Sequence, residues 1–186
     1  MKTTYPMTIA GCKRELPLCK ASDSLVIAGF VIFGDVELTI ACAAELLKIA
    51  PEYDYMVAPE AKAIPLIYEM AKQSGQNEYF LVRKAPKLYM AGVFETEVKS
   101  ITTEAVQKLY MDAADAEKIK GKRILIIDDV ISTGESVAGV EKLVNEAGGI
   151  VVGRMSILAE GAAADRDDII FLEKLPIFDA EGNPLD

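Results

Sequence analysis

The segment Arg123–Ser136 reads RILIIDDVISTGES, a strand pattern that runs into two acids and then a loop of small residues. Its apolar start, Arg123–Asp128, predicts a buried strand. Ligands of parallel sheets bind beyond the carboxyl ends of the strands, which is where Asp128 and Asp129 fall. The loop exposes backbone N–H groups at the positive end of the next predicted helix, and this favours an anion. Carboxylates that accept from hydroxyl groups, beside an anion site, indicate a sugar phosphate such as ribose 5-phosphate.

Two adjacent acids after a strand also occur at metal-binding corners and as exposed charges near a helix N-cap. Here the acids stand in an ordered set, in which an apolar strand and Asp128–Asp129 precede Ser132–Thr133–Gly134 and a helix. We expect that context to favour the sugar phosphate over either alternative.

The composition predicts one globular domain over residues 1–186 and narrows the classes of partner. Hydrophobic residues make up 51% and charged residues 26%, and the net charge of −9 argues against nucleic acid or a membrane surface as partner. The absence of histidine excludes a histidine base or metal ligand. Cys12, Cys19 and Cys42 lack metal-ligand spacing and are typical of reduced thiols. With no membrane span or signal sequence in the pattern, we expect a cytoplasmic protein.

Apolar spacing along the chain alternates between strand and helix patterns, which predicts an α/β fold with a mostly parallel sheet flanked by helices. The expected strands are Leu25–Phe33, Tyr55–Ala58, Tyr79–Val82, Arg123–Asp128, Ile150–Leu158 and Ile169–Leu172, and the expected helices are Val36–Ile49, Lys62–Gln73 and Glu135–Ala147.

The pattern weakens between Lys84 and Lys122. Lys87–Met111 predicts a long irregular or hairpin-like excursion, which is uncommon inside a compact domain and usually functional where it occurs. A solvated surface hairpin and a mobile cover over an active site are both compatible with this segment.

At the opening motif the sequence resembles the type I phosphoribosyltransferases, which use phosphoribosyl pyrophosphate. The resemblance implies their core with a small hood, from roughly 1–34 and 158–186, and a flexible loop. It also implies that Asp128 and Asp129 serve catalysis and contact the ribose hydroxyls. The implied 5-phosphate cradle is Ser132, Thr133, Gly134, Glu135 and Ser136. Glu135 stands where the family often has a second glycine, and we expect its carboxylate to point outward.

Two further segments are similar to the adenine and xanthine branch of that family. VAPEAKAIPL, Val57–Leu66, resembles its strand and pyrophosphate loop, and FLVRKAPKL, Phe80–Leu88, resembles a segment of the adenine enzymes. A pyrophosphate leaving group requires clustered cations, which agrees with this resemblance. The implied pyrophosphate-binding residues are Glu60, Ala61, Lys62, Arg83, Lys84 and Lys87.

The resemblance implies a glycosyltransferase of purine salvage that joins a free purine to ribose 5-phosphate and releases pyrophosphate. Mg²⁺ would be held mainly by the phosphates and water, with no direct protein ligand, and the enzyme would be a homodimer. In adenine enzymes the mobile loop carries a Glu-Tyr pair over the site. Glu104 and Tyr110 are available here, with Glu104 as the candidate catalytic residue, although their spacing differs.

The expected base pocket involves Ile32, Phe33, Leu158 and Glu160. The 6-oxopurine enzymes commonly place a lysine near the last of these positions, whereas this chain has Glu160–Gly161. Adenine offers an amino donor and needs an acceptor, so the absence of lysine favours adenine. Xanthine, hypoxanthine, guanine and orotate remain alternative substrates. A regulatory protein that only senses phosphoribosyl pyrophosphate is an alternative function.

Overall fold

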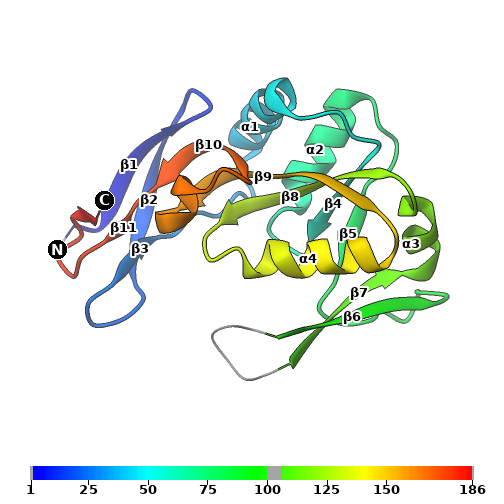
Figure 1. The fold of residues 1–186 in the computed structure, drawn as a ribbon. Coiled ribbons are helices and arrows are strands. Elements are labelled where there is room, and N and C mark those ends of the chain that lie inside the picture. Colours follow the sequence, from blue (N-terminus) through cyan, green and yellow to red (C-terminus); the bar gives the residue numbers. More distant parts are fainter. Residues whose placement is uncertain (1, 100–105, 186) are drawn as a thin grey trace.

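The computed structural model describes residues 2–99 and 106–185, and its centre is a five-stranded parallel sheet (Figure 1). The strand order is β10-β9-β8-β4-β5, and every neighbouring pair is parallel. This confirms the expected α/β class. The strands are β4 (Tyr55–Pro59), β5 (Phe80–Val82), β8 (Arg123–Ile131), β9 (Ile150–Glu160) and β10 (Ile170–Leu175).

Helices cover both faces of this sheet, and each face has its own apolar cluster. The helices are α1 (Val36–Ile49), α2 (Ile64–Ser74), α3 (Ala113–Ile119) and α4 (Glu135–Glu146). On one face Leu46 of α1 and Ile67 of α2 are fully buried, and on the other Ile119 of α3 and Val140 of α4 are. Because the central strands are buried on both faces, they form the continuous apolar runs seen in the sequence. None of the described helices is both long enough and apolar enough to cross a lipid bilayer.

A second, antiparallel sheet forms the hood from the two ends of the chain (Figure 1). The expected strand Leu25–Phe33 is wrong in extent, because only Val26–Ala28 is a strand, and this strand lies in the antiparallel sheet. The N-terminal hairpin was not expected, since Pro6 and Pro17 interrupt its strand patterns. The hood strands are β1 (Thr4–Ile9), β2 (Cys12–Lys20), β3 (Val26–Ala28), β11 (Ile177–Phe178) and β12 (Pro184–Leu185).

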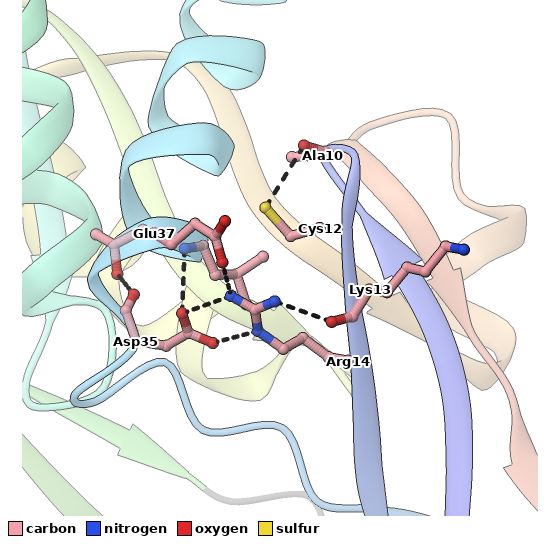
Figure 2. Close-up of polar contacts among 8 residues, drawn as sticks. Ala10, Cys12, Lys13, Arg14, Asp35 and Glu37 are labelled. Carbon is pink, nitrogen blue, oxygen red and sulfur yellow. Dashed lines mark hydrogen bonds and ion pairs between the residues drawn. The ribbon is translucent and has the colours of Figure 1, made fainter.

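An arginine clasp, Arg14 with Asp35 and Glu37, ties the hood hairpin to the start of α1 (Figure 2). Arg14 donates from Nε to Asp35 Oδ2 over 2.6 Å and from Nη2 to Asp35 Oδ1 over 2.8 Å. Its Nη2 also lies 2.8 Å from Glu37 Oε2. Asp35 caps the helix as well, because its Oδ1 accepts the N–H of Leu38 over 3.1 Å. One carboxylate therefore fixes both the helix start and the hood.

The excursion after β5 is a regular hairpin, which agrees with the hairpin-like alternative, and it is followed by a helix that was not expected. Its strands are β6 (Val93–Lys99) and β7 (Val106–Asp112), and α3 follows directly. The hairpin lies against α4 at Gly139, where an added Cβ would come within 2.8 Å of Leu109 Cδ1. Glu104 lies outside the described residues. The backbone of Tyr110 pairs with that of Arg83 through two N–H···O bonds of 2.8 Å.

Candidate active site

The acid pair lies inside strand β8 and not after its end. The strand continues through Asp128 and Asp129 to Ile131, because β9 goes on pairing with it, Asp128 opposite Ser156 and Ile131 opposite Ala159. The expected end of the strand at Asp128 is therefore wrong by three residues. Both acids still lie at the carboxyl end of the central strand, the ligand edge of such a sheet. Asp128 is 7% exposed and Asp129 is 2% exposed.

Burial of these two carboxylates leaves their charges poorly compensated. The backbone N–H of Asp129 donates to Asp128 Oδ1 over 2.9 Å. Desolvation, together with the charge of Asp129, raises the pKa of Asp128 well above the usual range of an aspartate. Lys62, whose side chain is 54% exposed, places Nζ 3.3 Å from Asp129 Oδ2. That contact is an ion pair without hydrogen-bond geometry, so Asp129 Oδ2 is a buried oxygen that can still accept a hydrogen bond.

The loop between β8 and α4 has the backbone geometry of an anion site. Gly134 caps the helix with a φ of +80°, a conformation that glycine adopts without strain. Ser132, Thr133 and Ser136 are exposed, and Thr133 Oγ1 accepts the N–H of Glu135 over 3.4 Å. The helix begins here with unsatisfied N–H groups and the positive end of its dipole. The loop can therefore bind a phosphate group.

Glu135 borders a cavity, and the outward direction expected for its carboxylate stays a prediction. It is half-buried and lines a cavity of about 350 Å³ with Glu60, Lys84, Thr133 and Ser136. Val98 and Leu109 of the β6–β7 hairpin close the same cavity. The hairpin lies against α4 at Gly139, one turn after Glu135, while Ser136 stays exposed.

The second predicted anion loop follows β4, with cationic residues at the end of the neighbouring β5. Arg83 donates from Nη1 to Glu60 Oε2 over 2.8 Å, and the backbone N–H of Lys84 donates to Glu60 Oε1 over 3.2 Å. The Glu60–Ala61 peptide bond is cis. Glu60 therefore joins the two strand ends. The Arg83 guanidinium is therefore already paired with Glu60. The side chains of Lys62 and Lys84 are exposed, Lys62 beside the acid pair and Lys84 beside the cavity.

The structure places some predicted residues at the border of this cluster or beyond it. The Arg83 guanidinium, which pairs with Glu60, also lies 5.7 Å from the ring centre of Tyr89 and lines a second hollow with it. Lys87 lies in the turn beyond it, where its backbone N–H donates to Met90 Sδ. Of the predicted base-binding residues, those that have no exposed surface are Ile32 and Leu158, whereas Phe33 is 50% exposed and Glu160 partly exposed. Their contact with a base remains a prediction.

Arg166 is a residue at this edge that the sequence pattern did not single out. A Cβ added to Gly134 would overlap Nη1 of Arg166, so the guanidinium lies directly against the anion loop. Arg166 follows the short helical turn Gly161–Asp165 between β9 and β10. The available signal was its place in the connection after a parallel strand, on the ligand edge of the sheet. The acidic neighbours in Asp165–Asp168 made it resemble an ordinary solvated residue.

Comparison with known proteins relates this geometry to one family. The sequence pattern named Phosphoribosyl transferase domain matches residues 39–183. Adenine phosphoribosyltransferase of Thermotoga petrophila is 37% identical over 101 residues, which are 54% of this chain and 56% of that protein. The corresponding enzyme of Petrotoga mobilis is 34% identical over 115 residues, 59% of this chain and 60% of that protein. The chain thus matches little more than half the length of these relatives.

Solved structures give the same relation at the level of the fold. The crystal structure of adenine phosphoribosyltransferase from Thermoanaerobacter pseudethanolicus superimposes with a TM-score of 0.64 at 25% identity, covering 77% of this chain and 84% of that one. The Saccharomyces cerevisiae enzyme, solved with adenine and an imino-altritol bisphosphate, superimposes with a TM-score of 0.63 at 17% identity, covering 92% of each chain. At that identity the second likeness concerns the fold alone.

Proposed function

Because the chain belongs to the phosphoribosyl transferase domain family, we propose that it is a purine phosphoribosyltransferase of the adenine type. It transfers ribose 5-phosphate from phosphoribosyl pyrophosphate to the base, releases pyrophosphate and forms a nucleoside monophosphate. The observation that carries the proposal is the buried pair Asp128–Asp129, directly followed by the glycine-capped loop at Gly134. Together they offer acceptors for a vicinal diol and donors for a phosphate, a few residues apart.

The proposed reaction is a displacement at the anomeric carbon of the ribose. A base nitrogen forms the new bond to that carbon, and the bond to the pyrophosphate oxygen breaks with its electron pair leaving on pyrophosphate. The ring develops positive charge in the transition state, which the carboxylates of Asp128 and Asp129 stabilise from a site of low polarity. In this proposal Lys62 and Lys84 take up charge on the leaving group. Positioning and electrostatics thus suffice, without a nucleophilic side chain.

Mg²⁺ belongs to this proposal as an ion that arrives with phosphoribosyl pyrophosphate. Bound to the leaving group, it would neutralise charge on the pyrophosphate. Within residues 2–99 and 106–185, no group of three or more metal-ligating side chains is arranged to hold an ion. In this proposal the ion is held mainly by phosphates and water, and the buried Asp129 Oδ2 can accept a hydrogen bond from a hydroxyl or a water nearby.

Adenine is the proposed base, on two grounds. The relatives named above are adenine enzymes, and Glu160 stands at a position where a lysine would be needed to donate to a 6-oxo group. Burying that oxygen without a donor costs roughly 1–3 kcal/mol, enough for about ten- to a hundredfold discrimination. We propose the same cytoplasmic, homodimeric context that the family resemblance implies.

A base screen tests the proposal most directly. The free bases are offered one at a time with phosphoribosyl pyrophosphate and Mg²⁺, and pyrophosphate release is measured. We expect adenine to have the highest kcat/KM. Higher efficiency with hypoxanthine, guanine or xanthine would contradict the choice of base and keep the enzyme class. Binding of phosphoribosyl pyrophosphate without turnover of any base would replace the enzyme with a sensor.

A further inference from the structure

The proposed 5-phosphate loop contains no cation of its own. Residues Ser132–Ser136 supply backbone N–H groups and hydroxyls, but the single charged side chain among them is Glu135. Asp128 and Asp129 precede the loop and are almost fully buried. A phosphate monoester carries up to two negative charges. At this loop it would be near the carboxyl groups of Asp128, Asp129 and Glu135, and like charges repel. Backbone donors compensate only part of that charge, and a nearby cation would strengthen binding.

Arg166 places a guanidinium against this loop from a different segment of the chain. It contacts the loop at Gly134, where Nη1 is the nearest side-chain atom to the position that a Cβ would take. Cζ lies 3.5 Å and Nη2 3.9 Å from the same position. Glycine is therefore required here twice, for its φ of +80° and for the approach of the guanidinium.

Asp168 holds the guanidinium in this orientation. Arg166 donates from Nε to Asp168 Oδ1 over 2.8 Å and from Nη2 to Asp168 Oδ2 over 2.7 Å, a bidentate pair. Both bonds use the edge of the fork away from the loop, so Nη1 is the nitrogen left facing Gly134. The side chain is 36% exposed, which leaves room for a ligand to reach it.

We propose that Arg166 binds the 5-phosphate of phosphoribosyl pyrophosphate and of the nucleotide product, with Asp168 as its positioning residue. This inference rests on the proposed function and adds a contact from the segment between β9 and β10. It divides recognition of the substrate between two cations from different segments. Arg166 serves the 5-phosphate, whereas Lys62, which lies beside Asp129, serves the pyrophosphate.

Calorimetric titration with the two halves of the substrate tests this division. Ribose 5-phosphate and Mg²⁺-pyrophosphate are titrated separately into wild type, Arg166→Gln and Arg166→Lys. We expect Arg166→Gln to weaken ribose 5-phosphate about tenfold or more and to leave pyrophosphate within about twofold. Arg166→Lys keeps the charge but loses the fork, so it should lie between the two. Arg123→Gln is the matched control, because Arg123 also pairs with an aspartate, Asp54, but at the opposite end of the sheet.

The outcomes separate this inference from the proposed function. Unchanged affinity of Arg166→Gln for ribose 5-phosphate overturns the inference, as does an equal loss for both ligands. If wild type binds neither ligand nor phosphoribosyl pyrophosphate, the proposed function itself is wrong. Thermal unfolding of each variant checks the fold, and should Arg166→Gln not fold, the lysine variant gives the same comparison with the charge retained.

Discussion

The acid pair on β8 and the arginine clasp of the hood use carboxylates in opposite ways. In the clasp, Asp35 receives two hydrogen bonds from Arg14 and caps a helix (Figure 2). Hydrogen bonding to Arg14 holds the pKa of Asp35 below its ordinary range. In the pair, Asp128 and Asp129 are more deeply buried and lie side by side. Burial and the neighbouring charge raise the pKa of Asp128.

The difference separates a carboxylate that stabilises the fold from one that is reserved for a ligand. Asp35 is compensated before any ligand arrives, so its charge contributes to stability. The charge of Asp128 opposes folding and becomes favourable only when hydroxyl donors or cations enter the site. Perturbed acids of this kind are typical of functional sites. Four predictions test this contrast, starting with the largest effect.

Replacing the acid that faces Lys62 should affect turnover most. Asp129→Asn keeps the shape but removes a charge that stabilises the developing cation, and we expect kcat/KM with adenine to fall about a hundredfold. Steady-state pyrophosphate release measures it. The matched control is Asp54→Asn, at the opposite end of the sheet, which should stay within about twofold. A drop of similar size in both variants would point to general damage and contradict the assignment.

Adding a third acid beside the pair should weaken binding of phosphoribosyl pyrophosphate. Thr133→Asp introduces a negative charge where the loop is expected to hold the 5-phosphate, so calorimetry should show at least about tenfold loss of affinity. Thr133→Ser keeps the hydroxyl and serves as control. Wild-type affinity in Thr133→Asp would show that the phosphate binds elsewhere.

Breaking the clasp should lower stability. Arg14→Gln leaves the half-buried Asp35 without its bidentate partner, and we expect a lower free energy of unfolding, seen as a lower urea midpoint. Because the folded-state pKa of Asp35 is lowered, this contribution is present at neutral pH and disappears as pH falls through that pKa. Urea unfolding across pH measures both. Lys20→Gln, which breaks the exposed Lys20–Asp23 pair, should cost less than about 0.5 kcal/mol.

Urea unfolding of a variant of the acid pair should show a gain in the free energy of unfolding, opposite in sign to the loss expected for Arg14→Gln. Asp128→Asn removes a buried charge, so we expect the free energy of unfolding without ligand to increase by about 1 kcal/mol. A raised folded-state pKa means that ionisation costs stability above that pKa and has no cost below the unfolded value. The gain should therefore be largest at alkaline pH and vanish in acid. Destabilisation at alkaline pH would mean that Asp128 is already compensated in the free protein.

The sequence predicted the parallel core well because its signals are local and strong. Val36–Ile49 is a helix with the expected bounds, and β8 was recognised from an uninterrupted apolar run. The hood was harder, because β3 pairs with β11 from the far end of the chain and no local pattern records that partner. Hairpin β6–β7 has weak alternation and gains its order from packing on α4.

The candidate site also contains residues that a local sequence pattern identifies and residues that only the fold brings together. Asp128, Asp129 and the Gly134 loop are contiguous in sequence, so motif and context located them. Arg166 reaches the loop from a connection more than thirty residues later, and only the fold places it there. The cavity beside Glu135 also depends on a distant segment, the hairpin that lines it with Val98 and Leu109.

The composition of the hood from both chain ends has a consequence for how the protein is made. During synthesis, β1, β2 and β3 leave the ribosome before the parallel core, yet β11 and β12, which complete their sheet, emerge after it. The partial hood therefore has an unpaired sheet edge, at β3, while the whole parallel core is translated. Open edges invite pairing with other chains. The Arg14–Asp35 clasp is available much earlier, as soon as α1 has emerged, and can hold the waiting hairpin against its own chain.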